Sequence, residues 1–432
     1  MTTGSRIAVI GAGYVGLPTA AVLARFGHVV VCAERDEVRF DALVAGRVPI
    51  LEEGLAELLA EGTASGRLRF VCRAEEAVRG ARYVFLCVAT PERDDGAADL
   101  SFVEAVASEI AEALDPDAIV VNKSTVPVGT ALAVERITGA TVVSNPEFLR
   151  EGSAVRDSLR PDRVVVGADD RRAARQVGEL FSRTGAPLIV TDTVTAETIK
   201  YASNAFLATK LSFVNALAGL CESVGADVRD VVLGLGYDRR IGFDFLRPGP
   251  GWGGSCLPKD TSALVHLADR SGYDFALLRA AIAANEEARD RVVQKVERAA
   301  GDALSGATVG VWGLTFKAGT DDRRMSPAVA IARRLVELGA EVRAYDPTVD
   351  PIVDPKSAPE DLQGMVLCAD AYDACRGASA VAVLTEWDEL RGLDFAKVAD
   401  LMATPALVDA RNLLDPAALR RYGFTYSGIG RR

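Results

Sequence analysis

The stretch that decides the fold is "IAVIGAGYVGLPTA", residues 7–20, in which three glycines separate an apolar, β-branched run from a helical pattern. A bare G-x-G-x-x-G pattern is weak evidence, but one placed between a strand and a helix strongly indicates a dinucleotide-binding βαβ unit. Gly11 and Gly13 let the backbone turn and approach a pyrophosphate, and Gly16 lets the helix pack against the strand. The helix N-terminus then supplies amide groups and the positive end of a dipole to the phosphates.

The residue that closes the second strand indicates the coenzyme. "HVVVCAE", residues 28–34, is another apolar run, and it ends at Glu34. A carboxylate at this place can bind both ribose hydroxyls and would repel a 2′-phosphate, so the sequence favours NAD over NADP. Arg35 weakens this preference, because a guanidinium there could accept the phosphate.

Four further apolar runs predict strands, and each ends in small polar residues. They are residues 83–90, 118–125, 141–147 and 163–167. In an open parallel sheet, ligands bind beyond the carboxyl ends of the strands. Thr90, Thr125 and Glu147 lie at these ends and are therefore candidate site residues. Each threonine taken alone is also typical of an ordinary helix cap or turn.

From about residue 195 the strand pattern stops and a long helix is predicted. Its apolar face is formed by Leu207, Leu211, Val214, Ala218 and Cys221, at spacings of four and three. A helix near 30 residues is longer than the core of one domain requires. We interpret it as a connector between domains, with an apolar face free for a second subunit; the alternative is a core helix within one chain. Lys200 and Asn204 share one face of this helix.

The last third of the chain starts a second alternation of strands and helices. Its strand-like runs are 307–322, 341–347, 378–390 and 406–414, with a helix over 327–338. The predicted fold class is therefore α/β, with two doubly wound Rossmann-like domains joined by a long central helix. The second sheet lacks the glycine fingerprint and is expected to bind another nucleotide-like ligand or simply to pack. We place the domains at 1–194, 195–300 and 301–432.

Composition excludes several classes of protein. The 432 residues carry a formal charge of −11, which argues against nucleic acid or an anionic membrane as the main partner. The seven cysteines are scattered without a CxxC pair, as in reduced cytosolic proteins, and no metal site is predicted. The two histidines cannot build a multi-histidine metal centre. No signal peptide is evident and no apolar run approaches the roughly 18 residues of a membrane span, so we expect a soluble cytoplasmic protein.

A second glycine-rich stretch carries the candidate nucleophile. "PGWGGSCLPKD", residues 250–260, places Cys256 close to Lys259 and Asp260. The simplest interpretation is a tight turn with a buried thiol. The alternative is a nucleophile, because a nearby cation or helix N-terminus favours the thiolate. Lys259 could act in this way, while Asp260 opposes it unless the carboxylate orders a water or a lysine. A cysteine beside a nicotinamide can trap an aldehyde as a thiohemiacetal, which is then oxidised to a thioester.

Six motifs in order give the chain a strong resemblance to a known family. They are "IAVIGAGYVGLPTA", "NKSTVPVGT", "SNPEFLREG", "ETIKYASNAFLATKLSF", "GGSCLPKD" and "GLTFKAGTDD". The sequence resembles the UDP-glucose/GDP-mannose dehydrogenase family over essentially its whole length. The resemblance implies oxidation of the 6-hydroxymethyl group of a nucleotide sugar to a carboxylate, with two NAD and one water. It also implies two Rossmann-like domains and a homodimer formed through the central helix.

The resemblance assigns roles to the candidate catalytic residues. Cys256 would be the nucleophile, and Lys200 would stabilise the C6 alkoxide and the later oxyanions. Asn204 would orient the substrate hydroxyl or a water, and Asp260 would order that water with Lys200. Glu147 is the expected base for thioester hydrolysis. Thr125 is expected to position a water and the surroundings of the nucleophile.

The resemblance also implies two sets of binding residues. The expected cofactor-binding residues are Gly11, Gly13, Tyr14, Val15, Gly16, Glu34, Arg39, Thr90, Thr125, Glu151, Lys259 and Arg324. The expected substrate-binding residues are Phe148, Leu149, Arg150, Glu151, Lys200, Asn204, Arg240, Phe245, Gly253, Lys317 and Arg411. No nucleic acid or membrane is expected as a partner.

Departures from the family pattern leave the exact substrate open. Glu34 replaces the usual aspartate, and Met325 stands where glutamate is frequent. Arg247-Pro248 is closer to the GDP-mannose branch than to the UDP-glucose branch, which more often has Asn-Ala. UDP-glucose is the first expectation, with dTDP-glucose and GDP-mannose as alternatives. Two alternatives come from other functional classes: a non-catalytic NAD-binding regulatory protein, and a two-electron hydroxyacid dehydrogenase, which would not need Cys256.

Overall fold

The protein is described by a computed structural model that covers residues 4–93, 95–301 and 303–431. The chain forms two compact units, and each is described by itself. Unit 1 comprises Met1–Ser203 and Ser262–Leu267, and unit 2 comprises Asn204–Thr261 and Ala268–Arg432. The boundary between them falls inside one helix, α9 (Thr193–Val224). The three-part division at 194 and 300 that the sequence suggests is finer than this and stays a prediction.

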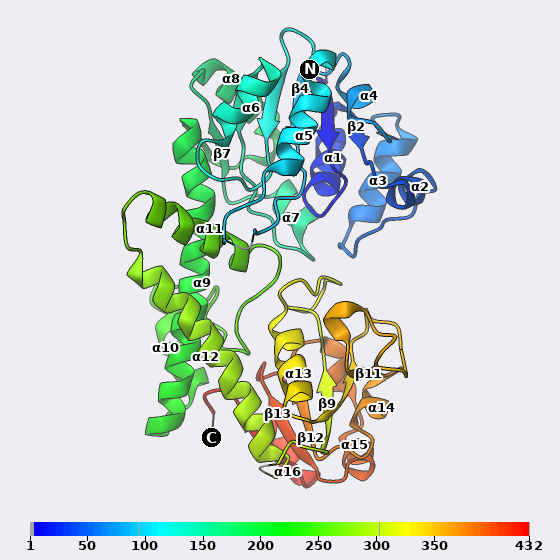
Figure 1. Cartoon of the computed structure of the whole chain (residues 1–432), viewed down its shortest axis with the longest axis vertical. Helices are drawn as coiled ribbons and strands as arrows, with labels where there is room; N and C mark the ends of the chain where they lie inside the picture. Colours follow the sequence, from blue (N-terminus) through cyan, green and yellow to red (C-terminus); the bar gives the residue numbers. More distant parts are fainter. Residues whose placement is uncertain (1–3, 94, 302, 432) are drawn as a thin grey trace. The chain divides into compact units, whose positions relative to one another are not determined.

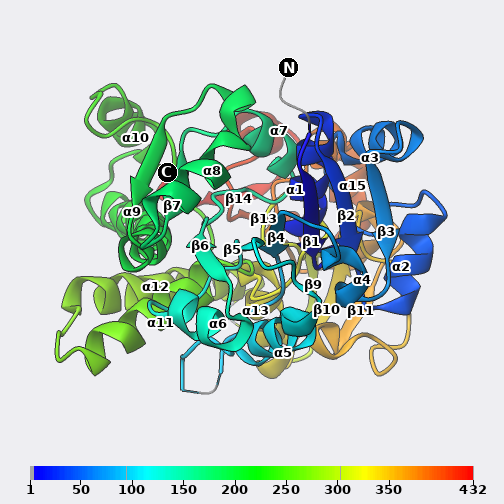
Figure 2. The same cartoon turned by 90° about the horizontal axis from the view of Figure 1, so that it is seen from above.

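Unit 1 contains an eight-stranded sheet in the order β3-β2-β1-β4-β5-β6-β7-β8 (Figures 1 and 2). Its strands are β1 (Arg6–Ile10), β2 (Val29–Ala33), β3 (Leu68–Val71), β4 (Tyr83–Leu86), β5 (Ile119–Asn122), β6 (Thr141–Ser144), β7 (Val164–Gly167) and β8 (Leu188–Thr191). Its helices include α1 (Gly16–Arg25), α2 (Glu37–Val44), α3 (Leu55–Ala64), α4 (Ala74–Val78), α5 (Ser101–Ile110), α6 (Thr130–Thr138), α7 (Ala154–Leu159) and α8 (Arg171–Glu179). The first six strands run parallel, and β7 pairs antiparallel with β6 through Ser144 and Gly167.

Alternating residues of the central strand explain why unit 1 needs helices on both faces. Ile7 and Val9 belong to one buried cluster, while Ala8 and Ile10 belong to another. Successive side chains of a strand point to opposite faces, so both faces of the sheet are apolar and covered. Because the first six strands run parallel, their polar carboxyl ends lie at the same edge of the sheet, and the candidate residues lie there.

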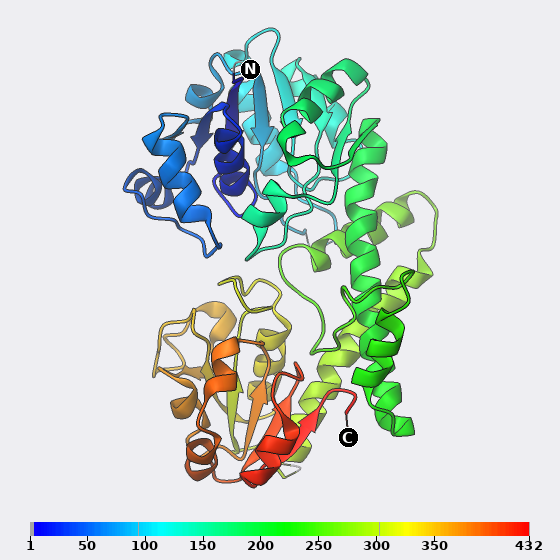
Figure 3. The ribbon, with the colours of Figure 1, turned by 180° about the vertical axis from the view of Figure 1, so that it is seen from behind.

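Unit 2 contains a second sheet, in the order β11-β10-β9-β12-β13-β14 (Figure 3). Its strands are β9 (Thr308–Trp312), β10 (Glu341–Tyr345), β11 (Met365–Leu367), β12 (Ala380–Val383), β13 (Ala406–Asp409) and β14 (Thr425–Gly428). Its other helices include α10 (Val228–Gly236), α12 (Ala276–Ala299), α13 (Pro327–Glu337), α14 (Ala371–Cys375), α15 (Phe395–Leu401) and α16 (Pro416–Arg421), and α11 (Leu257–Arg270) begins in unit 2. Both sheets share the 3-2-1-4-5-6 order of a Rossmann fold, so the predicted fold class is confirmed.

Helix α9 corrects one detail of the sequence interpretation. Val214, Ala218 and Cys221, which belong to the face predicted to be free for a second subunit, are buried, and the last two lie in the core of unit 2. A different row of apolar residues, which includes Phe206 and Phe213, is exposed. The error arose because both rows are apolar, so the sequence alone cannot rank them.

By length and composition, α9 could also cross a membrane, and it is the single helix of the described chain that could. The buried share of its most apolar window is 44%. Core helices of globular proteins meet the same criterion, so this finding is weak evidence for a membrane span.

The glycine turn at the end of β1 yields a stability prediction. A Cβ on Gly16 would lie 1.8 Å from the backbone oxygen of Gly11, whereas a Cβ on Gly13 would meet nothing within 4 Å. We therefore expect Gly16→Ala to lower the free energy of unfolding by about 1–3 kcal/mol, because the backbone must shift. Gly13→Ala is the matched control and should change it by less than about 0.5 kcal/mol. Denaturant unfolding of both variants checks this, and equal losses would contradict it.

Candidate active site

The turn after β1 forms a cradle suited to a dinucleotide. Gly11 has a φ of +100°, and its N–H donates to the Ala33 carbonyl at 2.9 Å, which ties the turn to the end of β2. The space beside Gly13 is open, so a phosphate can approach the backbone there. Glu34 is 6% exposed, and it accepts hydrogen bonds from Ala12 N at 3.1 Å and Asp36 N at 2.9 Å. These residues fit the NAD that the fingerprint predicts.

The two arginines near Glu34 have different surroundings. Arg35 lies over the ring of Phe102, with Cζ 5.2 Å from the ring centroid, and this cation–π contact holds it against α5. Arg39 lies 3.7 Å from the Glu34 carboxylate, with its own side chain 43% exposed. The sequence could not predict the contact of Arg35 with Phe102, because the two residues are far apart in the chain.

The loops after β4 and β5 are joined by short hydrogen bonds. Thr90 Oγ1 donates to the Thr125 carbonyl at 2.7 Å, and Ser124 Oγ donates to the Val88 carbonyl at 2.7 Å. Thr90 and Thr125 are both buried. The structure therefore brings together these two predicted residues, which follow neighbouring strands.

The centre of unit 1 is an ion pair between α9 and the segment after β6. Lys200 Nζ lies 2.6 Å from Glu147 Oε1, and each side chain is only 4% exposed. Glu147 Oε2 also accepts the Leu149 N–H at 2.6 Å. Burial opposes ionisation of this carboxyl, but the Lys200 charge and these hydrogen bonds outweigh it and lower the pKa of Glu147. Glu147 is therefore held as a carboxylate, as a general base requires.

The "FLRE" segment that follows Glu147 is fastened from three sides. The Arg163 guanidinium stacks on the Phe148 ring at 3.7 Å. Arg150 forms a bidentate pair with Asp157, and buried Glu52 accepts the Gly152 N–H at 2.8 Å. The sequence interpretation did not single out Arg163, Asp157 or Glu52. Asp157 lies one helical turn into α7 and only seven residues from Arg150, so that pair could have been found from spacing.

A cavity of about 90 Å³ lies beside this segment, and its lining includes Lys123, Glu147 and Arg163. Lys123 is buried; its ammonium donates to Asn145 Oδ1 at 3.2 Å and lies 5.4 Å from the Phe181 ring centroid. Burial lowers the pKa of Lys123, with Glu147 and Cys87 opposing this. Lys123 stands in the "NKST" motif, yet its chemistry gave no signal in the sequence, since most lysines are solvated.

Unit 2 holds the other predicted catalytic residues around Asp260. This carboxylate is fully buried and accepts two hydrogen bonds. Asn204 Nδ2 donates to one oxygen at 2.5 Å, and Lys259 Nζ donates to the other at 2.6 Å. Asp260 therefore holds the Lys259 ammonium, which is the alternative that the sequence left open for this carboxylate, and the effect of Lys259 on the Cys256 thiol stays a prediction. Cys256 is partly exposed and immediately precedes α11, where the amide end of the helix favours an anionic sulfur.

The glycines before Cys256 are required by close backbone approach. A Cβ on Gly253 would lie 2.1 Å from the Met325 carbonyl, and Gly251 and Gly254 have φ of +108° and +83°. Trp252 is buried. Its indole N–H donates to Ser212 Oγ on α9 at 2.8 Å, and its backbone N–H donates to Asn285 Oδ1 on α12 at 2.7 Å. The turn therefore has one shape, set by the helices beneath it.

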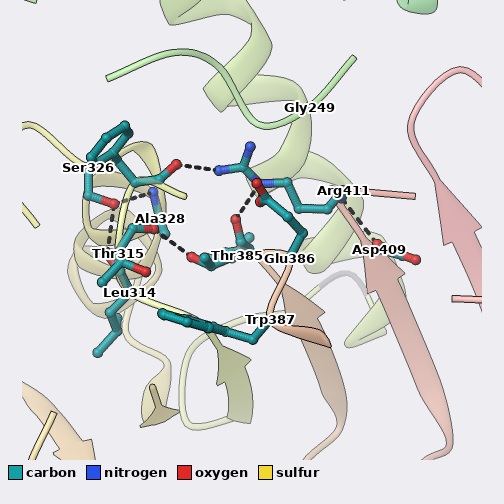
Figure 4. Close-up of polar contacts among 12 residues, drawn as sticks. Gly249, Leu314, Thr315, Ser326, Ala328, Thr385, Glu386, Trp387, Asp409 and Arg411 are labelled. Carbon is teal, nitrogen blue, oxygen red and sulfur yellow. Dashed lines mark hydrogen bonds and ion pairs between the residues drawn. The ribbon is translucent and has the colours of Figure 1, made fainter. Parts of the chain in front are cut away.

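At the carboxyl ends of the second sheet, Arg411 binds two different segments, one after β9 and one after β12 (Figure 4). Its guanidinium donates to the Phe316 carbonyl at 2.7 Å and the Leu384 carbonyl at 2.8 Å, and lies 3.0 Å from the Glu386 carboxylate. Lys317 follows Phe316 directly and lies over its ring. The structure therefore brings Arg411 close to the predicted "GLTFK" segment, through the backbone of that segment.

The remaining predicted residues lie in more exposed surroundings. The Arg240 side chain is 89% exposed and pairs with Asp238, and Arg324 pairs with Asp322. Phe245, Met325 and Asn412 are the non-glycine residues of the described chain with positive φ, and each is, or directly follows, a residue predicted to bind the substrate or the cofactor. Such backbone strain gathers at functional sites. The described residues contain no group of three His, Cys, Asp or Glu side chains suited to a metal.

Comparisons with known proteins agree with this geometry. Models of the UDP-glucose/GDP-mannose dehydrogenase family match the chain at residues 5–184 (NAD binding domain), 194–287 (central domain) and 310–416 (UDP binding domain). The UDP-glucose 6-dehydrogenase of Rhizobium meliloti (strain 1021) is 46% identical over 439 residues, 99% of each chain. The Pseudomonas aeruginosa UDP-glucose 6-dehydrogenase is 44% identical, covering 99% of this chain and 97% of that one. A solved UDP-glucose dehydrogenase from Pyrobaculum islandicum is 37% identical, with a TM-score of 0.90 over 100% of this chain and 99% of that chain.

The buried ion pair predicts a pH-dependent stability difference. In the wild type, the lowered pKa of Glu147 adds stability above the ordinary carboxyl value of 4.5, and this stability is lost as the pH falls. In Lys200→Met the carboxyl stays buried without its partner, so its pKa rises and stability is lost as the pH rises. We expect the variant to be about 3–5 kcal/mol less stable at neutral pH, with a much smaller deficit near pH 4.

Thermal unfolding of both proteins between these pH values measures the difference. Lys356→Met, at an exposed lysine, is the matched control and should follow the wild type. A deficit of Lys200→Met that does not change with pH would contradict the assignment of a charged Glu147.

Proposed function

Because the chain belongs to the UDP-glucose/GDP-mannose dehydrogenase family, we propose that it oxidises UDP-glucose at C6 to the uronate through a covalent intermediate on Cys256. One observation carries the proposal. Cys256 directly precedes α11, and Asp260, in the first turn of that helix, is buried and accepts hydrogen bonds from Asn204 and Lys259. A two-electron dehydrogenase has no use for such a thiol. The relatives named UDP-glucose 6-dehydrogenase, at 46% and 44% identity, support UDP-glucose as the sugar nucleotide.

The protein's own residues have defined roles in the two oxidations. NAD, when bound at the glycine turn and Glu34, accepts the two electrons and the hydrogen of each oxidation. The C6 hydroxyl, oriented by Asn204, gives its proton to a water, and Lys200 stabilises the alkoxide that this leaves. The Cys256 thiolate then forms a bond to the aldehyde carbon, the electron pair of the carbonyl π bond moves to its oxygen, and Lys200 is proposed to stabilise this oxyanion. The second oxidation of this thiohemiacetal leaves a thioester on Cys256.

Hydrolysis of the thioester needs a base, and Glu147 is suited to that role. Its carboxylate takes a proton from a water, which forms a C–O bond at the acyl carbon while the C–S bond breaks. The sulfur leaves as the thiolate, so Cys256 is regenerated in its reactive form. Thr125 and Asp260 are proposed to position the waters of these steps. The lowered pKa of Glu147 keeps it ready to accept the proton.

We assign the diphosphate and nucleoside to the second sheet. Residues 310–416 match the UDP binding domain of the family, and Arg411 and Lys317 supply cations at the carboxyl ends of its strands. Arg240 and the backbone of the "FLRE" segment are the further candidates for substrate contacts. dTDP-glucose and GDP-mannose remain the alternative substrates, because the loop with Arg247-Pro248 departs from the UDP-glucose pattern. Localisation in the cytoplasm stays a prediction.

A homodimer through α9 is also proposed. Phe206, Phe213 and Leu220 are seven residues apart along the helix and are 69%, 57% and 57% exposed. Large apolar side chains in a row on one helix face are typical of an interface. A second copy of the chain is the occupant that the family resemblance implies.

Charge on this row should separate the subunits. In light scattering, we expect the wild type to have the mass of two 45.7 kDa chains and Phe213→Glu to have the mass of a single chain. The reason is that the dimer would bury the new carboxylate in the interface. Val353→Glu, at a side chain 83% exposed outside this row, is the matched control and should stay dimeric. A dimeric Phe213→Glu would place the interface elsewhere.

The nucleophile is tested by replacing its sulfur. With UDP-glucose and excess NAD, the wild type should give two NADH for each sugar, without free aldehyde. Cys256→Ser should bind both ligands but lose overall turnover by several orders of magnitude, because a serine hydroxyl is far less ionised than a thiol near neutral pH. Serine is similar in size, so the melting temperature should change little.

NADH counting and thermal unfolding on one preparation separate the two interpretations of Cys256. Near-normal turnover with a lowered melting temperature would show that the thiol only packs. One NADH per sugar in the wild type, with a carbonyl product, would overturn the four-electron reaction. A panel with dTDP-glucose, GDP-mannose and UDP-N-acetylmannosamine identifies the preferred sugar nucleotide.

A further inference from the structure

Asn122, at the end of β5, is a buried amide with no hydrogen-bond partner for either side-chain atom. The residue is 2% exposed, and both Oδ1 and Nδ2 lack a partner. Buried polar groups are nearly always paired, and an unpaired one costs stability, so such an amide requires an explanation. The sequence singled out the "NKST" motif that begins with this residue, but the reaction proposed above gives Asn122 no role.

The amide lies at a small cavity that reaches the site. The cavity has a volume of about 10 Å³, and its lining includes Asn122, Thr125, Ser144, Glu197 and Lys200. This is close to the space that one water molecule needs, about 10–15 Å³. Asn122 and Ser144 are aligned partners in the parallel strands β5 and β6, so their side chains point to the same face of the sheet. Lys123, the next residue, points to the other face, where it bonds to Asn145.

The lining supplies the partners that a buried water requires. Glu197 lies on α9 three residues before Lys200 and is 3% exposed. Its carboxylate accepts hydrogen bonds from Gly129 N at 2.7 Å, Ala131 N at 3.1 Å and Ser144 Oγ at 3.1 Å. Buried waters typically make about three hydrogen bonds, and the amide, the hydroxyl, the carboxylate and the ammonium together offer both donors and acceptors.

We propose that this cavity binds one water molecule, which Asn122 and Glu197 hold against the Lys200 ammonium, and that Asn122 is a positioning residue for Lys200. The ammonium already pairs with Glu147 at 2.6 Å. A second fixed hydrogen bond on the side of the cavity limits the rotation of the ammonium and keeps it in the orientation that the substrate oxygen requires. The consequence for catalysis rests on the proposed function, whereas the water site itself does not.

Crystallography and kinetics of one variant test the two parts. In crystals of the wild type that diffract to about 1.5 Å or better, we expect an ordered water within hydrogen-bond distance of the Asn122 amide. Asn122→Leu, which keeps the branching of the side chain but cannot form hydrogen bonds, should lose this water. Its kcat should fall about ten- to hundredfold with KM for UDP-glucose and NAD unchanged, since a misplaced Lys200 affects the reacting centre rather than binding.

Two further variants separate positioning from packing. Asn122→Ser leaves a hydroxyl and room for a second water, so it should recover part of the lost kcat. Asn145→Leu removes an amide that is fully bonded, to Lys123 and to the Val165 carbonyl at 2.8 Å, and its melting temperature should fall. Asn122→Leu should not show such a fall, because its amide has no protein partner to lose.

The outcomes distinguish this inference from the proposed function. An empty cavity in the wild-type crystal, or an Asn122→Leu variant with unchanged kcat, would overturn the inference. An ordered water together with a wild type that does not oxidise UDP-glucose would instead overturn the proposed function and leave the water site standing. If Asn122→Leu fails to fold, the wild-type crystal and Asn122→Ser still decide the question.

Discussion

The buried ion pair between Lys200 and Glu147 is the interaction on which the site of unit 1 depends. It joins α9 to the segment after β6, at 2.6 Å and almost out of contact with water. A buried pair of this kind adds little net stability, because the attraction mainly repays the cost of removing two charges from water. Its retention is better explained by what each partner does for the other: the cation keeps the carboxyl ionised, and the carboxylate fixes the cation in one place.

The two sheets have the same strand order, but the carboxylate that follows the second strand of each sheet has a different role. In unit 1, Gly11 donates to Ala33 and Glu34 accepts Ala12 N. In unit 2, Gly313 donates to the Tyr345 carbonyl at 2.7 Å, and Asp346 takes the place of Glu34. Asp346 Oδ2 accepts hydrogen bonds from Leu314 N, Thr315 N, Thr315 Oγ1 and the Trp387 indole. The carboxylate that would bind a ribose in one sheet is thus consumed in holding a loop in the other.

This difference explains which parts of the molecule could be predicted from the sequence. Both Rossmann-like sheets follow from local patterns: apolar runs, the glycine turn and Glu34. The edge strands β3, β8, β11 and β14 were not predicted, because none of them is fully buried and their apolar pattern is therefore less continuous than that of fully buried strands such as β4, β5 and β12. The faces of α9 were assigned wrongly, since burial there depends on which neighbours pack against it rather than on apolar spacing.

The sequence predicted individual site residues only where they belong to a motif. It did not predict which residues form hydrogen bonds or ion pairs with them. Lys259 and Asp260 both lie near Cys256 in the sequence, and spacing alone left open whether Lys259 acts on the thiol or pairs with Asp260; the pair is present. Asn122 and Lys123 are adjacent in the sequence and equally polar, yet the pleat of β5 sends one to the Lys200 cavity and the other to Asn145. A buried polar side chain acquires its role from the face to which the strand turns it. The chemistry at the edge of this sheet is therefore set jointly by the motif, which supplies the residue types, and by the register of the parallel strands, which decides which of them meet.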